Sequence, residues 1–200
     1  MPRVSEAHKV ARREQIVNAA VRCFYRNGFH PTTMDDIVRE SGLSAGAVYT
    51  YFAGKDELIA AAGSHKLTEL RAVVDRLVAT EPVPTPAETI QALVDRVVEI
   101  TVDGDVDLAR IIVNGWGETP RNAALREVVQ AGYAAFLIGA RDLIRRWREA
   151  GHVGPEVDDD AATALLSLLL DFIVQRAVVG PIDPAAYVRG VTALIGGPRD

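Results

Sequence analysis

The sequence predicts an all-α protein with a small N-terminal domain, residues 1–54, and a larger helical domain, residues 55–200. Apolar residues recur at intervals of three and four along nearly the whole chain, as one face of a helix requires. The alternation typical of strands is almost absent, and glycine and proline divide the chain into about nine helical segments. The second and third segments are short and joined by a tight turn with a glycine, which is typical of a helix-turn-helix.

The first helix is expected to end at Asn27-Gly28, a pair that favours a left-handed cap. Its apolar stripe predicts the core of the small domain and consists of Ile16, Ala19, Ala20, Cys23 and Phe24. Thr33 is then a suitable N-cap for a helix over 34–41, and Ser44 for one over 45–51, with Gly42 between them.

A long helix is expected over 55–80, and the prolines at 82, 84 and 86 then predict a stiff, non-helical connector. The remaining helices are expected near 87–102, 105–116, 121–150, 158–179 and 184–195. Trp147, among three arginines, is expected on a solvated helix end.

Composition favours a soluble protein inside the cell, in the cytoplasm. Hydrophobic residues make up 48% and charged residues 24%, and Cys23 is the only cysteine, so no intramolecular disulfide is expected. The N-terminus does not resemble a signal peptide. The most apolar stretch, 161–179, is interrupted by polar residues, so no membrane span is expected.

Charge is unevenly distributed along the chain. Residues 1–55 carry eight Lys and Arg against five Asp and Glu, whereas the remainder carries 14 against 22. A basic N-terminal domain on an acidic body suits contact with a phosphate backbone, although this asymmetry alone is weak evidence.

The second short helix is expected to present an outer face to a DNA major groove. That face comprises Ala45, Gly46, Ala47, Tyr49 and Thr50. Small residues allow a close approach to base edges, and Thr50 offers a hydrogen bond and a methyl group. The N-termini behind Thr33 and Ser44 suit phosphate oxygens.

Tyr51 and Lys55 are expected to contact the phosphates of one strand from either side of a turn. A cation at a helix N-terminus is disfavoured, which supports a phosphate partner for Lys55. The alternatives are a core tyrosine and a solvated lysine.

The runs 28–37, 42–52 and 55–58 together resemble the DNA-binding domain of the TetR (tetracycline repressor) family. The resemblance covers roughly residues 9–60. Val38 and Ser41 depart from it where alanine is usual. It implies that Thr33, Ser44, Tyr51 and Lys55 match phosphate contacts, and that Ala45, Ala47, Tyr49 and Thr50 match base-proximal positions. It also implies a homodimer through the last two helices.

A small-molecule pocket is expected in the helical body, mostly apolar with a few polar groups. Its candidate residues are Arg110, Asn114, Trp116, Glu118, Tyr133, Phe136, Asp171 and Gln175. Asp171 is the foremost candidate because an unpaired buried carboxylate is costly, the alternatives being a salt bridge or surface exposure.

These observations predict a TetR-type transcriptional regulator, by family habit a repressor, that binds a palindromic double-stranded DNA operator and is released by a small, mostly apolar effector. No phosphate-binding loop or Cys/His cluster is evident, so neither an enzyme, a cofactor nor a metal is expected. An activator on the same scaffold and a helical small-molecule carrier without specific DNA recognition are the alternatives.

Overall fold

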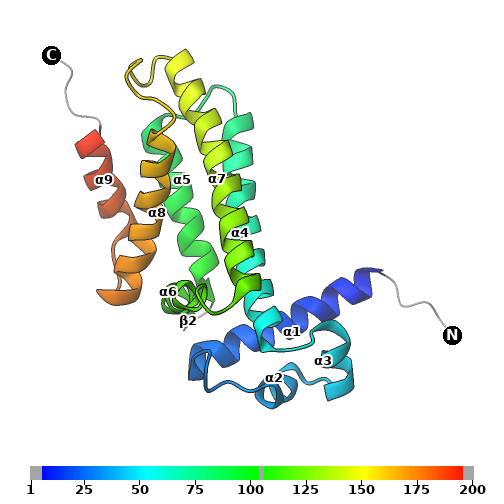
Figure 1. Ribbon diagram of the computed structural model, residues 1–200. Coiled ribbons are helices and arrows are strands. Elements are labelled where there is room, and N and C mark those ends of the chain that lie inside the picture. The colour runs from blue at the N-terminus through cyan, green and yellow to red at the C-terminus, as the bar shows by residue number, and fades with distance from the viewer. Residues whose placement is uncertain (1–5, 104–105, 196–200) are drawn as a thin grey trace. The chain divides into compact units, whose positions relative to one another are not determined.

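The computed structural model describes residues 6–103 and 106–195, and over these residues the chain contains nine helices and one pair of two-residue strands. The predicted all-α class is confirmed. The chain forms two compact units (Figure 1): unit 1 is Met1–His65 with Asn114–Val129, and unit 2 is Lys66–Val113 with Gln130–Asp200. These units are defined by packing, and the functional boundary expected at 54/55 stays a prediction.

Unit 1 is built on three helices, α1 (Glu6–Asn27), α2 (Met34–Ser41) and α3 (Ala45–Tyr51), and the start of α4 (Lys55–Ala79). The bounds expected for α2 and α3 are confirmed. The apolar stripe of α1 is buried as predicted, and it is joined in the core by Ile37, Val48, Phe52 and Leu58. The two short helices are therefore held by side chains from their inner faces.

Bonded caps define both short helices. Thr33 and Asp36 form a reciprocal capping box at the start of α2, and the Ser44 hydroxyl accepts a bond from the Ala47 amide. Gly42 has a φ of 69°, which favours glycine, and its amide donates to the Arg39 carbonyl. Both short helices and the turn between them are therefore held by bonds within unit 1.

Ser41 stands where alanine is usual in the family that the sequence resembles, and its hydroxyl is used in the structure. Its hydroxyl is buried, donates to the Val38 carbonyl at 2.8 Å and accepts from the Leu43 amide at 3.2 Å. An alanine makes neither bond, so here the serine strengthens the turn.

Unit 1 also includes the end of α6 (Ala109–Glu118) and the start of α7 (Ala123–Glu149). The Asn122 side chain accepts from the Leu125 amide at 2.9 Å and donates to the Asp56 carbonyl at 3.3 Å. This buried asparagine thus caps α7 and ties it to the first turn of α4.

In unit 2, α5 (Pro86–Thr101) packs against α8 (Ala161–Val178) and α9 (Pro184–Ile195). A second capping box, between Thr85 and Glu88, begins α5. The rest of α4 and α7 run side by side, close enough that Val74 lies against Gly139. The centre of unit 2 is filled by side chains such as Leu93, Leu143, Ile144, Leu169 and Phe172.

Two local expectations were wrong. The helix expected from residue 105 begins at Ala109, because β1 (Val102–Asp103) pairs antiparallel with β2 (Val106–Asp107); residues 104 and 105 lie outside the described residues. Trp147 is buried, and its indole donates to the Pro84 carbonyl at 2.7 Å. The proline connector therefore packs on a tryptophan that was expected in solvent.

By length and composition alone, α8 is long and apolar enough to cross a membrane. Six of its residues are buried in unit 2, among them Leu165, Leu169 and Phe172. A helix that packs within a folded domain meets the same test, so this observation is weak evidence for a membrane span.

Candidate nucleic-acid interface

Helix α3 has a buried side and an exposed side, as expected. Val48 is fully buried, whereas Ala45, Gly46, Tyr49 and Thr50 are exposed. Ala47 is partly exposed and lies at the margin of that face. The predicted base-proximal residues therefore share one accessible surface.

Two side chains of this face, Thr50 and Tyr49, carry polar groups. The Thr50 hydroxyl donates to the Gly46 carbonyl at 2.7 Å, so it keeps its acceptor lone pairs and its methyl group for a partner. Tyr49 is 49% exposed. A large aromatic side chain in solvent suits a role in contact with another molecule.

The two helix N-termini expected to face phosphates are not equivalent. Asp35 and Asp36 occupy the first turn of α2, whereas the first turn of α3 has no acidic residue. Hydrogen bonds from Thr33 hold the pKa of Asp36 below its usual range. The N-terminus of α2 is thus already served by carboxylates, and that of α3 carries no such charge.

Lys55 has three acceptors within unit 1. Its ammonium donates to the carbonyls of Phe29 at 2.7 Å, Thr32 at 2.9 Å and His30 at 3.0 Å. These carbonyls account for a lysine at a helix N-terminus without a phosphate, so its position no longer supports the predicted phosphate contact, which stays a prediction. Tyr51 is partly exposed, so it is not a fully buried core tyrosine, and its predicted phosphate contact stays a prediction.

Helices α1 and α2 are tied together at the surface. Glu40 accepts from Arg22 at 2.6 Å and also pairs with Arg26. These bonds lower the pKa of Glu40. Cys23 lies beneath, 1% exposed, and burial raises the pKa of its thiol, so it is a small core residue as expected.

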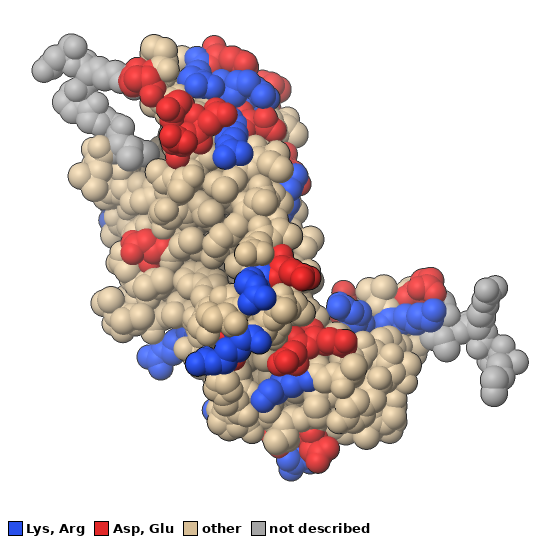
Figure 2. Space-filling view, in the orientation of Figure 1, with Lys and Arg blue, Asp and Glu red and all other residues tan. Residues whose placement is uncertain are grey.

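Figure 2 shows one face of the molecule, on which basic and acidic side chains of unit 1 stand next to one another. Ion pairs within unit 1 include Lys9–Glu6 and Arg39–Asp36. The basic excess of the N-terminal residues is therefore not gathered into one patch on that face.

The eight residues expected in an effector pocket are divided between the two units. Asn114, Trp116 and Glu118 belong to unit 1, and the other five belong to unit 2. Phe136 is buried, Arg110, Asn114 and Asp171 are exposed, and the others are partly exposed. That these residues form one pocket stays a prediction.

For Asp171 the premise of a buried carboxylate is wrong. The side chain is exposed and accepts a hydrogen bond from Gln175 Nε2 at 2.5 Å, one helical turn further along α8. Glu118 also has a partner, since its Oε1 lies 3.1 Å from His30 Nε2. Both carboxylates are thus accounted for without a ligand.

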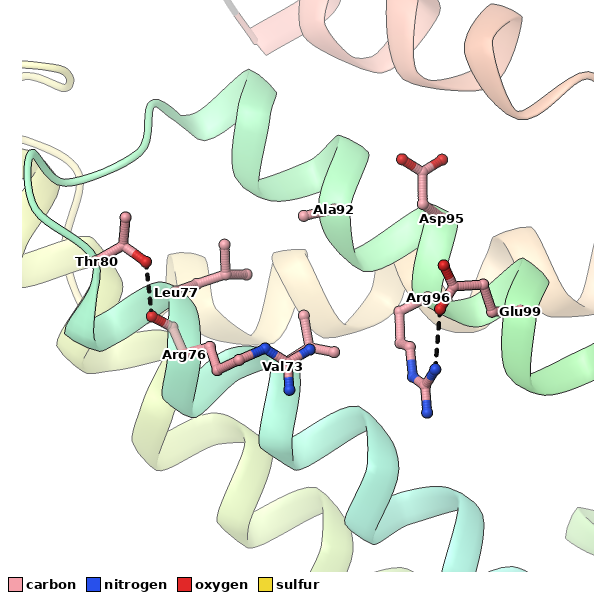
Figure 3. Close-up of a pocket in the computed structure, with 8 residues that line it drawn as sticks. All are labelled: Val73, Arg76, Leu77, Thr80, Ala92, Asp95, Arg96 and Glu99. Carbon is pink, nitrogen blue, oxygen red and sulfur yellow. Dashed lines mark hydrogen bonds and ion pairs between the residues drawn. The ribbon is translucent and has the colours of Figure 1, made fainter.

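A hollow of about 330 Å³ lies between α4 and α5 in unit 2 (Figure 3). None of the expected pocket residues contributes to it. The hollow is lined by Val73, Arg76, Leu77, Thr80, Ala92, Asp95, Arg96 and Glu99. Arg96 is engaged by Glu99 at 2.9 Å and by Glu69 at 3.1 Å, so the walls carry charges of both signs.

Sequence reasoning missed four residues that tie elements of unit 1 together, namely Arg22, Arg26, Glu40 and Asn122, and it assigned Glu118 to a pocket and not to its contact with His30. The only signal available was the opposite charge of Arg22, Arg26 and Glu40 near facing helix ends. Nothing in the sequence indicates that Asn122 meets Asp56, because these residues are 66 positions apart.

Comparison with known proteins identifies the arrangement. The family described as "Bacterial regulatory proteins, tetR family" matches residues 16–62, which run from the middle of α1 to the first third of α4. A transcriptional repressor of Mycobacterium tuberculosis, Rv1474c, is 29% identical over 92% of this chain and 91% of its own length. The uncharacterized transcriptional regulator YfiR of Bacillus subtilis is 30% identical over 88% of this chain and 85% of its own.

A solved structure shows the same fold. SmeT, the repressor of the Stenotrophomonas maltophilia multidrug efflux pump SmeDEF, has a TM-score of 0.68 and is 24% identical, over 92% of this chain and 89% of its own. The relatives are regulators and not enzymes, which agrees with the expectation from the sequence. With nearly full-length similarity to YfiR and the family match over its helix-turn-helix, the chain belongs to the TetR family of DNA-binding transcriptional regulators.

Proposed function

We propose that the protein is a repressor that binds a palindromic double-stranded DNA operator as a homodimer, in the cytoplasm. The observation that carries this proposal is the two-sided α3, with Val48 buried and Tyr49 and Thr50 exposed. In the bound state α3 lies in the major groove, where Ala45, Gly46 and Ala47 allow close approach to base edges.

Around α3 we propose phosphate contacts from the backbone amides behind Thr33 and Ser44 and from the Tyr51 hydroxyl. The absence of acidic residues in the first turn of α3 makes Ser44 the better of the two N-termini. Lys55 belongs to the same interface, but its three bonds to carbonyls give it another role, which is developed below.

For the homodimer we propose an interface formed by α8 and α9. Their exposed residues are mostly small, and small side chains allow the helices of two subunits to pack closely. On α8 these are Thr163, Ala164 and Ser167, and on α9 they are Ala185, Ala186, Gly190 and Ala193. A two-fold dimer would present two α3 helices to two operator half-sites.

We further propose that a small, mostly apolar effector binds the helical body and lowers operator affinity. The coupling needed is on the order of 1–3 kcal/mol or more. The hollow between α4 and α5 is lined by four charged residues, so it suits a polar molecule better and is not assigned to this effector.

Operator binding is tested by fluorescence anisotropy with DNA from the region upstream of the protein's own gene, across a salt series. A variant with Tyr49→Ala and Thr50→Ala should bind at least about thirtyfold more weakly, as loss of base contacts implies. Tyr25→Ala is the matched control, because Tyr25 is also an exposed tyrosine of unit 1, at 40% against 49% for Tyr49.

Equal losses in both variants would contradict the assignment of α3 as the recognition helix. If the wild type prefers no sequence, even after selection from a random DNA library, the repressor proposal fails. Tight binding of apolar small molecules in that case would favour the helical carrier instead.

A further inference from the structure

The segment between α1 and α2 closes around the ammonium group of Lys55. An ammonium has three N–H donors, and here they meet the carbonyls of Phe29, His30 and Thr32 at 2.7 to 3.0 Å. The donor capacity of this lysine is therefore fully used within unit 1.

The carbonyls that receive Lys55 are themselves held in place. Phe29 is 9% exposed, and its ring lies 4.9 Å from the ring of Phe24. Thr32 is 1% exposed, and its hydroxyl donates to the Gly28 carbonyl at 2.7 Å. The segment thus presents a preformed site for a compact cation, and this site compensates for the unfavourable position of a cation at the N-terminus of α4.

The 29–32 segment that Lys55 contacts leads directly into α2. Thr32 is followed directly by Thr33, the N-cap of α2, and α2 leads through the Gly42 turn to α3. Lys55 is the first residue of α4. One side chain therefore joins the start of α4 to the point where α2 begins, and so to the helix that carries the exposed face.

We propose that Lys55 is a positioning residue: it holds the 29–32 segment so that α2 and α3 keep the arrangement that binds DNA, and it does not itself contact a phosphate. The part of this inference that concerns DNA rests on the proposed function. A phosphate contact would require Lys55 to leave three carbonyls, two of them on the buried residues Phe29 and Thr32, and buried carbonyls without partners are costly.

The wild-type protein provides a test without substitutions, because the chain has only three lysines, at positions 9, 55 and 66. Reductive methylation is followed by mass spectrometry, with and without operator DNA. Lys9 and Lys66 are internal references, with side chains 51% and 34% exposed. Lys55 should react on the order of ten times more slowly than both in the free protein, because its amine must first be released from its partners.

The proposal also predicts that operator DNA barely changes the reactivity of Lys55. It is overturned if Lys55 reacts as fast as Lys66 in the free protein and becomes protected only when DNA is added. The reaction rate of Lys55 in the free protein does not depend on the repressor proposal. The measurement therefore tests the contact between Lys55 and the 29–32 segment even if the protein does not bind DNA.

Three variants separate positioning from charge: Lys55→Met, Lys55→Arg and the control Lys66→Met, which removes the same charge from the same helix. The planar guanidinium of arginine keeps the charge but does not direct three donors at these three carbonyls. Both Lys55 variants should therefore increase amide exchange in peptide 28–36 on the order of tenfold in the free protein, whereas Lys66→Met should not.

For the folded fraction of each Lys55 variant, operator affinity should fall while its dependence on salt stays that of the wild type. A purely global effect on stability would leave the affinity of the folded fraction unchanged, which contradicts the proposal. Full binding by Lys55→Arg, together with a salt slope in Lys55→Met that is shallower by about 0.9 per lost contact, would show a phosphate contact instead. If neither variant folds, methylation of the wild type still decides.

Discussion

Units 1 and 2 differ in what their surfaces expose. In unit 1 the short helices begin with bonded caps, and ion pairs tie α1 to α2. In unit 2 large apolar side chains stand in solvent, with Val178 72%, Val179 79% and Leu194 86% exposed. The most exposed large apolar side chain described in unit 1 is Val10, at 55%.

This difference bears on the two partners proposed above. Burial of apolar surface stabilises association by roughly 25 cal/mol per Å², so an uncovered apolar surface favours a permanent protein partner. An exposed helix face of small residues with one tyrosine and one threonine is suited to reversible contact with a hydrated, charged molecule such as DNA. The difference therefore agrees with the proposed dimer contact in unit 2 and the proposed operator contact in unit 1.

The largest effect is expected from removing one buried ring from the core of each unit, which tests whether the two cores are equally well packed. Phe24→Ala in unit 1 and Phe172→Ala in unit 2 each remove a ring that is at most 2% exposed. Each should lower the free energy of unfolding by about 3–5 kcal/mol, measured by chemical denaturation. Tyr25→Ala is the control, and an equal loss in that variant would show that ring burial does not explain the effect.

The second prediction addresses the surface of unit 2. A Cβ atom at Gly190 would meet nothing within 4 Å in the single chain, and Gly190 is exposed, so Gly190→Trp should leave the subunit folded. A subunit packed at this position would clash, and the dimer dissociation constant should rise on the order of a hundredfold in analytical ultracentrifugation. Gly117→Trp is the control, since Gly117 is equally open; an unchanged dimer in both variants would exclude α9 from the interface.

A smaller effect compares the two capping boxes. Thr33→Ala and Thr85→Ala should each lower the free energy of unfolding by about 1 kcal/mol. Only Thr33→Ala should also weaken operator binding, because Thr33 begins α2 in unit 1 and Thr85 begins α5 in unit 2. Equal loss of DNA affinity in both variants would argue against a local role for the α2 cap.

The smallest effect concerns the tie between α1 and α2. The pKa of Glu40 is lowered in the folded protein by bonds to Arg22 and Arg26, so its contribution to stability is present above the ordinary glutamate pKa. It is lost as pH falls through the lower folded value. Glu40→Gln should therefore reduce the melting temperature slightly at pH 7, and the difference from wild type should shrink as the pH falls below the ordinary glutamate pKa and vanish below the folded pKa of Glu40. A difference that grows with acid would refute this linkage.

The sequence alone determined the features that depend on neighbouring residues. The caps at Thr33 and Ser44, the turn at Gly42 and the buried stripe of α1 follow from interactions over three or four positions. These interactions are nearly the same in any protein, which explains why the bounds of α2 and α3 were predicted correctly.

Only the tertiary structure decided which distant groups meet. Lys55 meets carbonyls 23 to 26 residues away, Trp147 meets Pro84 across 63 residues, and Asp171 proves to be exposed on α8. No periodicity records such pairs, because the positions of distant groups depend on how whole helices pack. The chain's residue types therefore predict where its helices begin and end, whereas packing decides whether a charge contacts solvent, a carbonyl or DNA.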